Sequence, residues 1–363
     1  MSTIKVDTIK NRSSAINLPN NFKIGGNSII QGYTASGSEP SSPATGDFWW
    51  DSSNDKLYRY INGEFKELGI AAAQFSWGGD RSVTHTGYTS TVSNVLEYHS
   101  IGTTGNAQDF GDLTVSRYQT SACSSGTRGV YIAGAGVPPS YAELNVMDYV
   151  TIATTGNATD FGDTLSAVDR TAATSDGTRG VIGGGSNGGN INTIQYITIA
   201  SAGNATDFGD LTQVMTNGSA MNDATRSIIN QGYSSATASM EYVTTQTTGN
   251  ATDFGDHSNY VSHGAASDAT RGLIMGGDSG SRINTISYVT IQTTGNTTDF
   301  GDLTVAGSRI GCASDGTYAT AVGGRDRSNT IDRVTVQTTG NATDHGDMAV
   351  TGQYTASASG AAS

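Results

Sequence analysis

Five histidines are the residues of this sequence best suited to proton transfer or metal binding near neutral pH. They are His85, His99, His257, His263 and His345, and they fall at unrelated positions of the chain. No serine-nucleophile motif, His-x-x-x-His pair or Cys/His metal spacing accompanies them. The sequence therefore predicts a protein that is not an enzyme and needs no cofactor.

Paired aspartates beside an asparagine are the strongest candidate metal ligands. One such set is Asn157, Asp160 and Asp163, and it recurs along the chain. A hard cation such as Ca²⁺ prefers several oxygen ligands of this kind. In the structural alternative, these side chains cap their own turns and the aspartates pair with recurring arginines, which are Arg128, Arg179, Arg226 and Arg271. Near-identical copies in every repeat favour the structural role, so we predict no metal site.

The charge of the chain excludes some partners. Its formal net charge is −13 and its pI is near 4.6. No basic stripe exists to displace counterions from phosphates, which argues against a nucleic-acid partner. No stretch approaches the roughly 20 apolar residues of a membrane span, and the opening MSTIKVDTIK lacks the apolar region of a signal peptide. We expect a soluble protein without membrane insertion, with Cys123 and Cys312 unpaired.

An internal repeat organises most of the chain. The segment GNATDFGD or a close variant occurs at 105–112, 156–163, 203–210, 249–256, 295–302 and 340–347. Successive copies lie 51, 47, 46, 46 and 45 residues apart, a period that matches one four-stranded propeller blade. In the unit that starts at Arg170, an Asp-Gly turn joins two short strands, a third strand NTIQYITI follows, and Phe208 lies in the fourth. We expect Phe208 to form an aromatic wedge between blades.

These units resemble kelch repeats, in which a strand ends in Gly-Gly, a later strand holds a Tyr and the last strand holds an aromatic residue. The double glycines are Gly78-Gly79, Gly183-Gly184, Gly276-Gly277 and Gly323-Gly324. The tyrosines are Tyr98, Tyr149, Tyr196, Tyr242 and Tyr288, with Arg333 at the sixth position. The tryptophan of kelch repeats is Phe here, and His345 in the last copy. The resemblance implies a β-propeller and says little about activity.

The strand count predicts six blades over residues 71–363. The Gly-Gly strand occurs six times, starting near Phe75 in the first copy, and that copy lacks the strand expected before it. An unmatched strand TASASG lies at 355–360, so we predict that it completes the first blade as its innermost strand. Such closure removes exposed sheet edges. The expected fold is an all-β, six-bladed, kelch-like propeller closed by the C-terminal strand and preceded by a small N-terminal β module.

The first 70 residues do not share the repeat. Residues 1–35 hold short strands, 36–46 a Pro-containing linker, and 46–70 a three-stranded aromatic meander. The aromatic area of the meander exceeds what about 25 residues can bury. We therefore predict that this module attaches to another surface through Trp49, Trp50, Tyr58 and Tyr60.

The opening MSTIKVDTIKN and the hairpin PATGDFWWDSSNDKLYRY resemble modules of tailed-phage virion proteins, particularly marine (cyanophage-like) ones. The resemblance implies a virion structural protein, such as a tail fibre or other appendage, assembled in the host cytoplasm. Its N-terminal module would bind other virion proteins, and its propeller would bind a glycan of the host surface, with homo-oligomers an option. The alternative is a carbohydrate-binding or enzymatic propeller of cellular origin.

One end of the predicted propeller is better suited to binding than the other. Two connections of each blade, Ser-Asp-Gly-Thr and Thr-Thr-Gly-Asn, are nearly constant, and both emerge at the same end of an up-and-down blade. The opposite end carries loops that differ in every repeat, and variable loops on a rigid scaffold are where binding usually resides. An equally open alternative is that loop lengths drift wherever nothing constrains them. Candidate ligand-binding residues in these loops are Arg81, Tyr88, Tyr141, Tyr233, Arg282 and Arg325.

Overall fold

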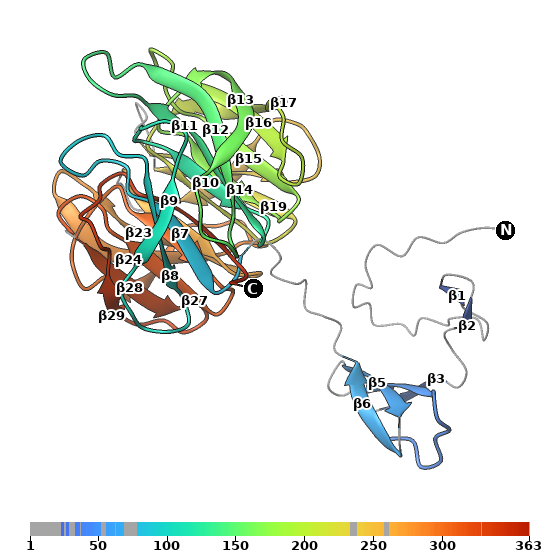
Figure 1. Ribbon diagram of the computed structural model, residues 1–363. Coiled ribbons are helices and arrows are strands. Elements are labelled where there is room, and N and C mark those ends of the chain that lie inside the picture. Colours follow the sequence, from blue (N-terminus) through green and yellow to red (C-terminus); the bar gives the residue numbers. More distant parts are fainter. Residues whose placement is uncertain are drawn as a thin grey trace. The chain divides into compact units, whose positions relative to one another are not determined.

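The chain is all-β and divides into two units, Met1–Ala73 and Gln74–Ser363 (Figure 1). The structure is a computed structural model that describes residues 23–24, 27–28, 33–36, 38–51, 56–61, 63–68, 78–232, 238–257, 261–327 and 329–362. Within these ranges there is no helix, and hence none that could cross a membrane.

The N-terminal unit holds a two-stranded hairpin and a four-stranded sheet. The hairpin pairs β1 (Lys23–Ile24) with β2 (Asn27–Ser28). The sheet contains β3 (Tyr33–Ser36), β4 (Phe48–Asp51), β5 (Lys56–Ile61) and β6 (Glu64–Leu68). The predicted three-stranded meander is therefore incomplete, because β3 adds a fourth strand parallel to β4. Parallel strands need a crossover between them, and the polar segment predicted as a linker forms that connection.

The larger unit is a six-bladed β-propeller, which confirms the predicted architecture. The innermost strands are, from blade one to blade six, β30 (Ala356–Gly360), β10 (Ser121–Ser124), β14 (Ala172–Ser175), β18 (Ser219–Asn222), β22 (Gly264–Ser267) and β26 (Gly311–Ser314). The second strands are β7 (Arg81–His85), β11 (Arg128–Ala135), β15 (Arg179–Gly183), β19 (Arg226–Asn230), β23 (Arg271–Asp278) and β27 (Tyr318–Val322).

The two outer strand positions complete each blade. The third strands are β8 (Val95–Ser100), β12 (Glu143–Thr151), β16 (Ile191–Thr198), β20 (Ser239–Thr244), β24 (Arg282–Thr290) and β28 (Thr330–Thr335). The fourth strands are β9 (Gln108–Asp112), β13 (Thr159–Val168), β17 (Thr206–Met215), β21 (Thr252–Asp256), β25 (Thr298–Asp302) and β29 (Thr343–Asp347). All neighbouring strands within a blade are antiparallel.

Blade one takes its innermost strand from the C-terminal part of the chain. Strand β30 pairs with β7 from Ala356 opposite His85 to Gly360 opposite Arg81. The predicted partner, Phe75–Gly79, is wrong: Gly78 and Gly79 precede the second strand, and Phe75 lies outside the described residues. In blades three, five and six the glycine pair lies at the C-terminal end of the second strand or directly after it, so aligning the repeats on Gly-Gly shifted the strand of blade one by several residues.

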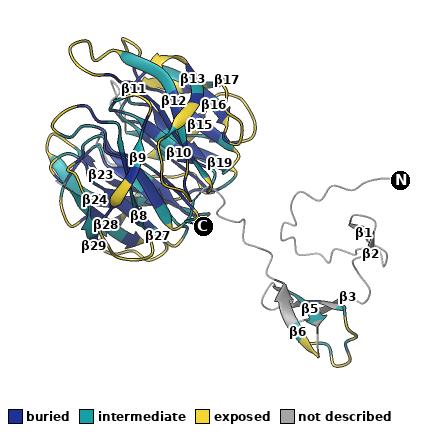
Figure 2. Cartoon of the chain, viewed as in Figure 1, coloured by how far each residue is buried: buried dark blue, intermediate teal, exposed yellow. Residues whose placement is uncertain are grey.

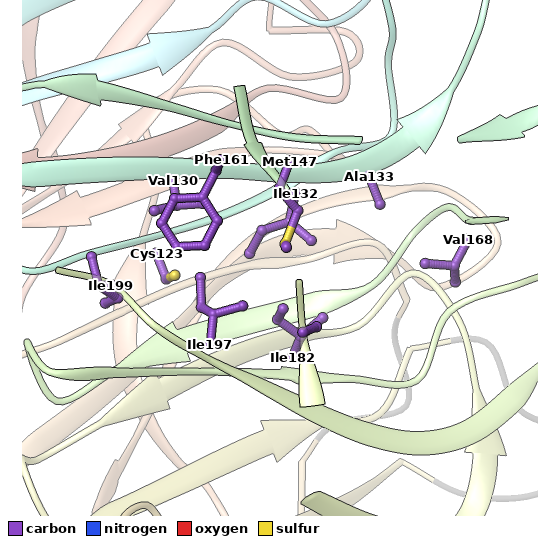
Figure 3. Close-up of a cluster of buried hydrophobic side chains, with 11 residues drawn as sticks. Cys123, Val130, Ile132, Ala133, Met147, Phe161, Val168, Ile182, Ile197 and Ile199 are labelled. Carbon is purple, nitrogen blue, oxygen red and sulfur yellow. The ribbon is translucent and has the colours of Figure 1, made fainter. Parts of the chain in front are cut away.

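Apolar side chains form clusters that span neighbouring blades. Figure 2 shows that much of the strand length of the propeller is buried. In Figure 3, Phe161, Ile132 and Met147 of blade two lie beside Ile182 and Ile197 of blade three. Phe208 is 2% exposed in the next cluster, where it contacts residues of blades three and four as predicted. Burial of these side chains is the main apolar stabilisation of the ring.

The GNATDFGD motif connects each blade to the preceding one. In blade three, Gly203 N–H donates to Phe161 O of blade two (2.6 Å), and the Asn204 carboxamide oxygen accepts from Asp163 N–H (3.0 Å). A Cβ on Gly162 would lie 2.6 Å from the Gly203 carbonyl, and Gly162 has φ +135°, which explains the glycine. The asparagines thus accept from backbone N–H groups of the preceding blade. The prediction that they cap their own turns is wrong.

The recurring arginines form a second contact between blades. Arg179 stacks over Tyr196, 4.2 Å from the ring centroid, and donates to Thr245 O of the next blade. Equivalent contacts, not the predicted pairs with motif aspartates, occur at Arg128, Arg226 and Arg271. In blade six the two residue types exchange places: Arg333 stacks over Tyr318 and donates to Gly102 O of blade one (2.7 Å).

Candidate binding site at the channel mouth

A cavity at one end of the propeller is lined by the same two positions of all six blades. It measures about 80 Å³, and we call the residues around it the channel mouth. The first of the two positions precedes the innermost strand by two residues. Its occupants are Gln119, Arg170, Asn217, Ser262, Arg309 and Tyr354. A position with fixed geometry thus holds five residue types.

The backbone at this position is the same in every blade. All six residues have positive φ values between 55° and 61°, a conformation that non-glycine residues rarely adopt. Backbone hydrogen bonds join consecutive members, from Arg170 N–H to Gln119 O (3.0 Å) and onward through Asn217 and Ser262 to Arg309. The ring of backbone therefore fixes where each side chain starts, and only the side-chain chemistry differs.

Four tyrosines extend from the mouth across neighbouring blades. Tyr118 is at the centre, with ring centroids 5.2 Å from Tyr354, 5.9 Å from Tyr88 and 6.2 Å from Tyr141. Tyr141 is 44% exposed, and the other three are half-buried. The Arg309 guanidinium stacks over Tyr354, 4.0 Å from the ring centroid. Aromatic faces that are open on one side can stack against the apolar face of a sugar ring.

Arginine side chains contribute positive charge to the channel mouth. Burial, and then the charges of Arg325, Arg282 and Arg170, lower the pKa of Arg309, although nearby Tyr354 acts in the opposite direction. Arg170 lies 3.5 Å from the Asp169 carboxylate. Burial raises the pKa of Asp169 to about 6, and Arg170 offsets part of that increase.

The predicted ligand-binding residues divide into three groups. Tyr88 and Tyr141 belong to the tyrosine cluster, and Arg282 and Arg325 lie close enough to Arg309 for their charges to lower its pKa. Tyr233 lies outside the described residues. The placement of Arg81 in a variable loop is wrong, because Arg81 begins β7 and stacks over Tyr98.

Sequence reasoning missed the residues of the mouth itself, including Tyr118, Tyr354, Arg170 and Arg309. All four lie in the links between blades, where their neighbours in sequence are also variable. A usable signal was present: the position two residues before each Ala/Ser-rich strand changes its residue type while the strand does not.

The histidines have structural surroundings. Burial lowers the pKa of His85 and of His263 to about 3, so both rings are neutral near pH 7. His85 Nδ1 lies 2.9 Å from Thr120 Oγ1, and its Nε2 lies 3.1 Å from Ser93 O. In the described part of the chain, no group of three or more His, Cys, Asp or Glu residues is arranged to hold a metal ion.

Comparison with known proteins does not extend this assignment. No protein-family model matches the sequence, and no curated protein matches it. The candidate site therefore rests on its geometry.

The predicted attachment residues lie in the sheet of the N-terminal unit. Trp49 is 7% exposed, stacks on Tyr58 with ring centroids 4.8 Å apart, and donates from Nε1 to Ser36 O. Strand β3 thus helps to bury Trp49 within its own unit. Tyr58 and Tyr60 are half-buried, and the side chain of Trp50 lies outside the described residues.

Proposed function

We propose that this chain is a structural protein of a tailed-phage virion, in a tail fibre or another appendage, and that its propeller binds a saccharide of the host surface at the channel mouth. The N-terminal module would hold the chain to other virion proteins. The protein would be assembled in the host cytoplasm and act in the virion.

The observation that carries the binding function is the tyrosine cluster beside the ring of six variable side chains. Rigid aromatic surfaces contribute contact area at small cost in side-chain entropy. The ring adds amide, hydroxyl and guanidinium donors at fixed starting points. Saccharides present apolar ring faces and many hydroxyl groups, so they complement both features.

The appendage role is supported by the resemblance of the N-terminal segment to virion modules and by the division of the chain into two units. Immunoelectron microscopy tests it, with an antibody against the propeller applied to phage particles. Label at the tail tip or fibres is the expected result. Label on cellular structures and none on particles would favour a propeller of cellular origin.

Removing the side chains of Tyr88, Tyr141 and Arg325 together should abolish most saccharide binding. We expect a Tyr88→Ala/Tyr141→Ala/Arg325→Gln variant to bind at least about tenfold more weakly, since tenfold corresponds to only about 1.4 kcal/mol. Binding is measured on a broad glycan array and the melting temperature by calorimetry. The control is Thr154→Ala/Thr247→Ala, two exposed residues of the constant turns. If only the control variant lost binding, the site would lie at the end that carries the constant turns, and the proposed site would be wrong.

Substitutions of aromatic residues in β4 and β5 of the N-terminal unit should affect assembly more than propeller folding. For Trp50→Ala/Tyr60→Ala we expect incorporation into particles to fall several-fold, because interface aromatic residues often contribute most of the binding energy. The melting transition of the propeller should not move. Quantitative blotting of purified particles measures incorporation. Normal incorporation of this variant would refute attachment through these side chains.

A further inference from the structure

The propeller contains 12 arginines and no lysine, against 25 acidic residues, so the whole net charge of −13 lies in this unit. Six arginines make the contacts between blades: Arg81, Arg128, Arg179, Arg226, Arg271 and Arg333. Two more, Arg117 and Arg327, are fully buried in ion pairs with Asp148 and Asp332. The remaining four are Arg170, Arg282, Arg309 and Arg325, and all belong to the mouth or its loops.

Two of these four already have carboxylate partners. Arg170 pairs with Asp169, and Arg282 pairs with both Asp278 (3.2 Å) and Asp326 (2.9 Å). For Arg309 and Arg325, no carboxylate of the described residues lies within 4.0 Å. Glu143, at the start of β12, accepts from Gly188 N–H. Of the four arginines at this end, Arg309 and Arg325 are thus the two without a carboxylate partner among the described residues.

These two arginines are neighbours. Arg325 exchanges two backbone hydrogen bonds with Ser308, the residue directly before Arg309 (Arg325 N–H to Ser308 O, 2.7 Å). Arg309 is held over Tyr354 at the wall of the cavity, next to the tyrosine cluster. An anion bound here would meet two guanidinium groups on one side and aromatic rings on the other.

A second observation places a polar group without a partner in the same cavity. The Gln119 side chain lines the mouth and is 7% exposed, and its Oε1 accepts no hydrogen bond from the described residues. A buried amide oxygen without a donor is costly. The hydroxyl of a bound ligand, reaching the cavity from the tyrosine side, would supply that donor.

We propose that the channel mouth recognises an acidic saccharide, with a sugar carboxylate held by Arg309 and Arg325 and the sugar ring stacked on the tyrosine cluster. This inference rests on the proposed saccharide binding and names its ligand class. Guanidinium groups bind carboxylates through paired, charge-assisted hydrogen bonds. Elsewhere the negative propeller would repel the same ligand, so binding would be confined to this end.

Matched glycans test the role of the carboxylate. The full-length protein is titrated with oligosaccharides of hyaluronan, alginate, polygalacturonate and polysialic acid, each beside its carboxyl-reduced or methyl-esterified form. Phosphomannan oligosaccharides serve as a phosphate arm and dextran as a neutral arm. At least one carboxylated form should bind at least tenfold more tightly than its neutral counterpart, and high salt should weaken that binding.

Variants assign the effect to the mouth. Arg309→Gln/Arg325→Gln should remove the preference for the carboxylated form while weaker, neutral binding through the tyrosines persists. Arg59→Gln, an exposed arginine of the N-terminal unit, is the charge-matched control and should bind as the unchanged protein does. An unshifted melting temperature shows that the double variant is folded.

The remaining outcomes separate this inference from the function on which it rests. Equal binding of charged and neutral forms would overturn the acidic ligand and leave saccharide binding in place. Binding of phosphomannan alone would overturn the carboxylate assignment. A carboxylate preference that survives in the double variant would overturn the assignment to these arginines. No binding in any arm would overturn the proposed saccharide binding itself.

Discussion

Removal of residues 353–363 should destabilise the propeller by several kcal/mol. The truncation deletes β30 and, with it, five residue pairs of the ladder with β7. It also deletes the hydrogen bonds from Thr355 Oγ1 to Val322 O and from Ser359 Oγ to Ser314 O of blade six. Each lost hydrogen bond contributes about 0.5–1.5 kcal/mol, so a loss of at least about 3 kcal/mol is expected. Chemical denaturation of the full-length and truncated chains measures it.

A peptide control distinguishes strand loss from general damage to the chain. A synthetic peptide of residues 353–363, added to the truncated protein, should restore stability in a saturable manner, because ligand binding to the native state stabilises it. A peptide of the same composition in scrambled order should not. An unchanged denaturation midpoint after truncation would contradict closure of blade one by β30.

The second large effect concerns a buried ion pair at the interface of blades one and two. Arg117 and Asp148 are fully buried and lie 2.8 Å apart, and Asp148 also accepts from the backbone and hydroxyl of Thr114. In Arg117→Ala the Asp148 carboxylate keeps its burial and loses its counter-charge. Such a change typically costs about 3–5 kcal/mol, which we expect to find by chemical denaturation.

A neutral replacement of the whole pair is the matched comparison. Arg117→Met with Asp148→Asn leaves no buried charge and retains an oxygen acceptor for Thr114, so we expect it to lose much less stability than the single variant. Arg327→Ala should resemble Arg117→Ala, since Arg327 and Asp332 form the equivalent fully buried pair in blade six. If the free energy of unfolding of Arg117→Ala lies within about 1 kcal/mol of that of the unchanged protein, the pair does not stabilise the interface.

The architecture could be predicted from the sequence because each blade repeats the same strand and turn motifs. A period near 46 residues sets the four-stranded unit, and the count of strand types sets the number of blades. The contacts between blades could not be predicted, because Asn204 and Arg179 act on backbone groups of other repeats. From neighbouring residues in the sequence, we expected the asparagine to cap its own turn and the arginine to pair with an aspartate of the motif.

The candidate site could be predicted only in part. Tyr88 and Tyr141 stood out as aromatic residues in variable loops, and both lie in the tyrosine cluster. Tyr118 and Tyr354 are far apart in the chain, and only the ring brings them together. Arg81 was misplaced because the prediction put the end of the second strand of blade one at Gly78-Gly79. That strand begins two residues later, at Arg81.

The position of β30 in the chain has a consequence for synthesis. About 270 residues separate His85 from Ala356, and ribosomes add roughly 5–20 residues per second. The inner edge of β7 therefore lacks its native neighbour for roughly 15–50 s of translation at these rates. Exposed strand edges invite pairing with other chains. Strand β7 reads Arg-Ser-Val-Thr-His, with a single apolar residue, and a polar edge of this kind is a poor template for aggregation while the newly made chain waits for its last strand.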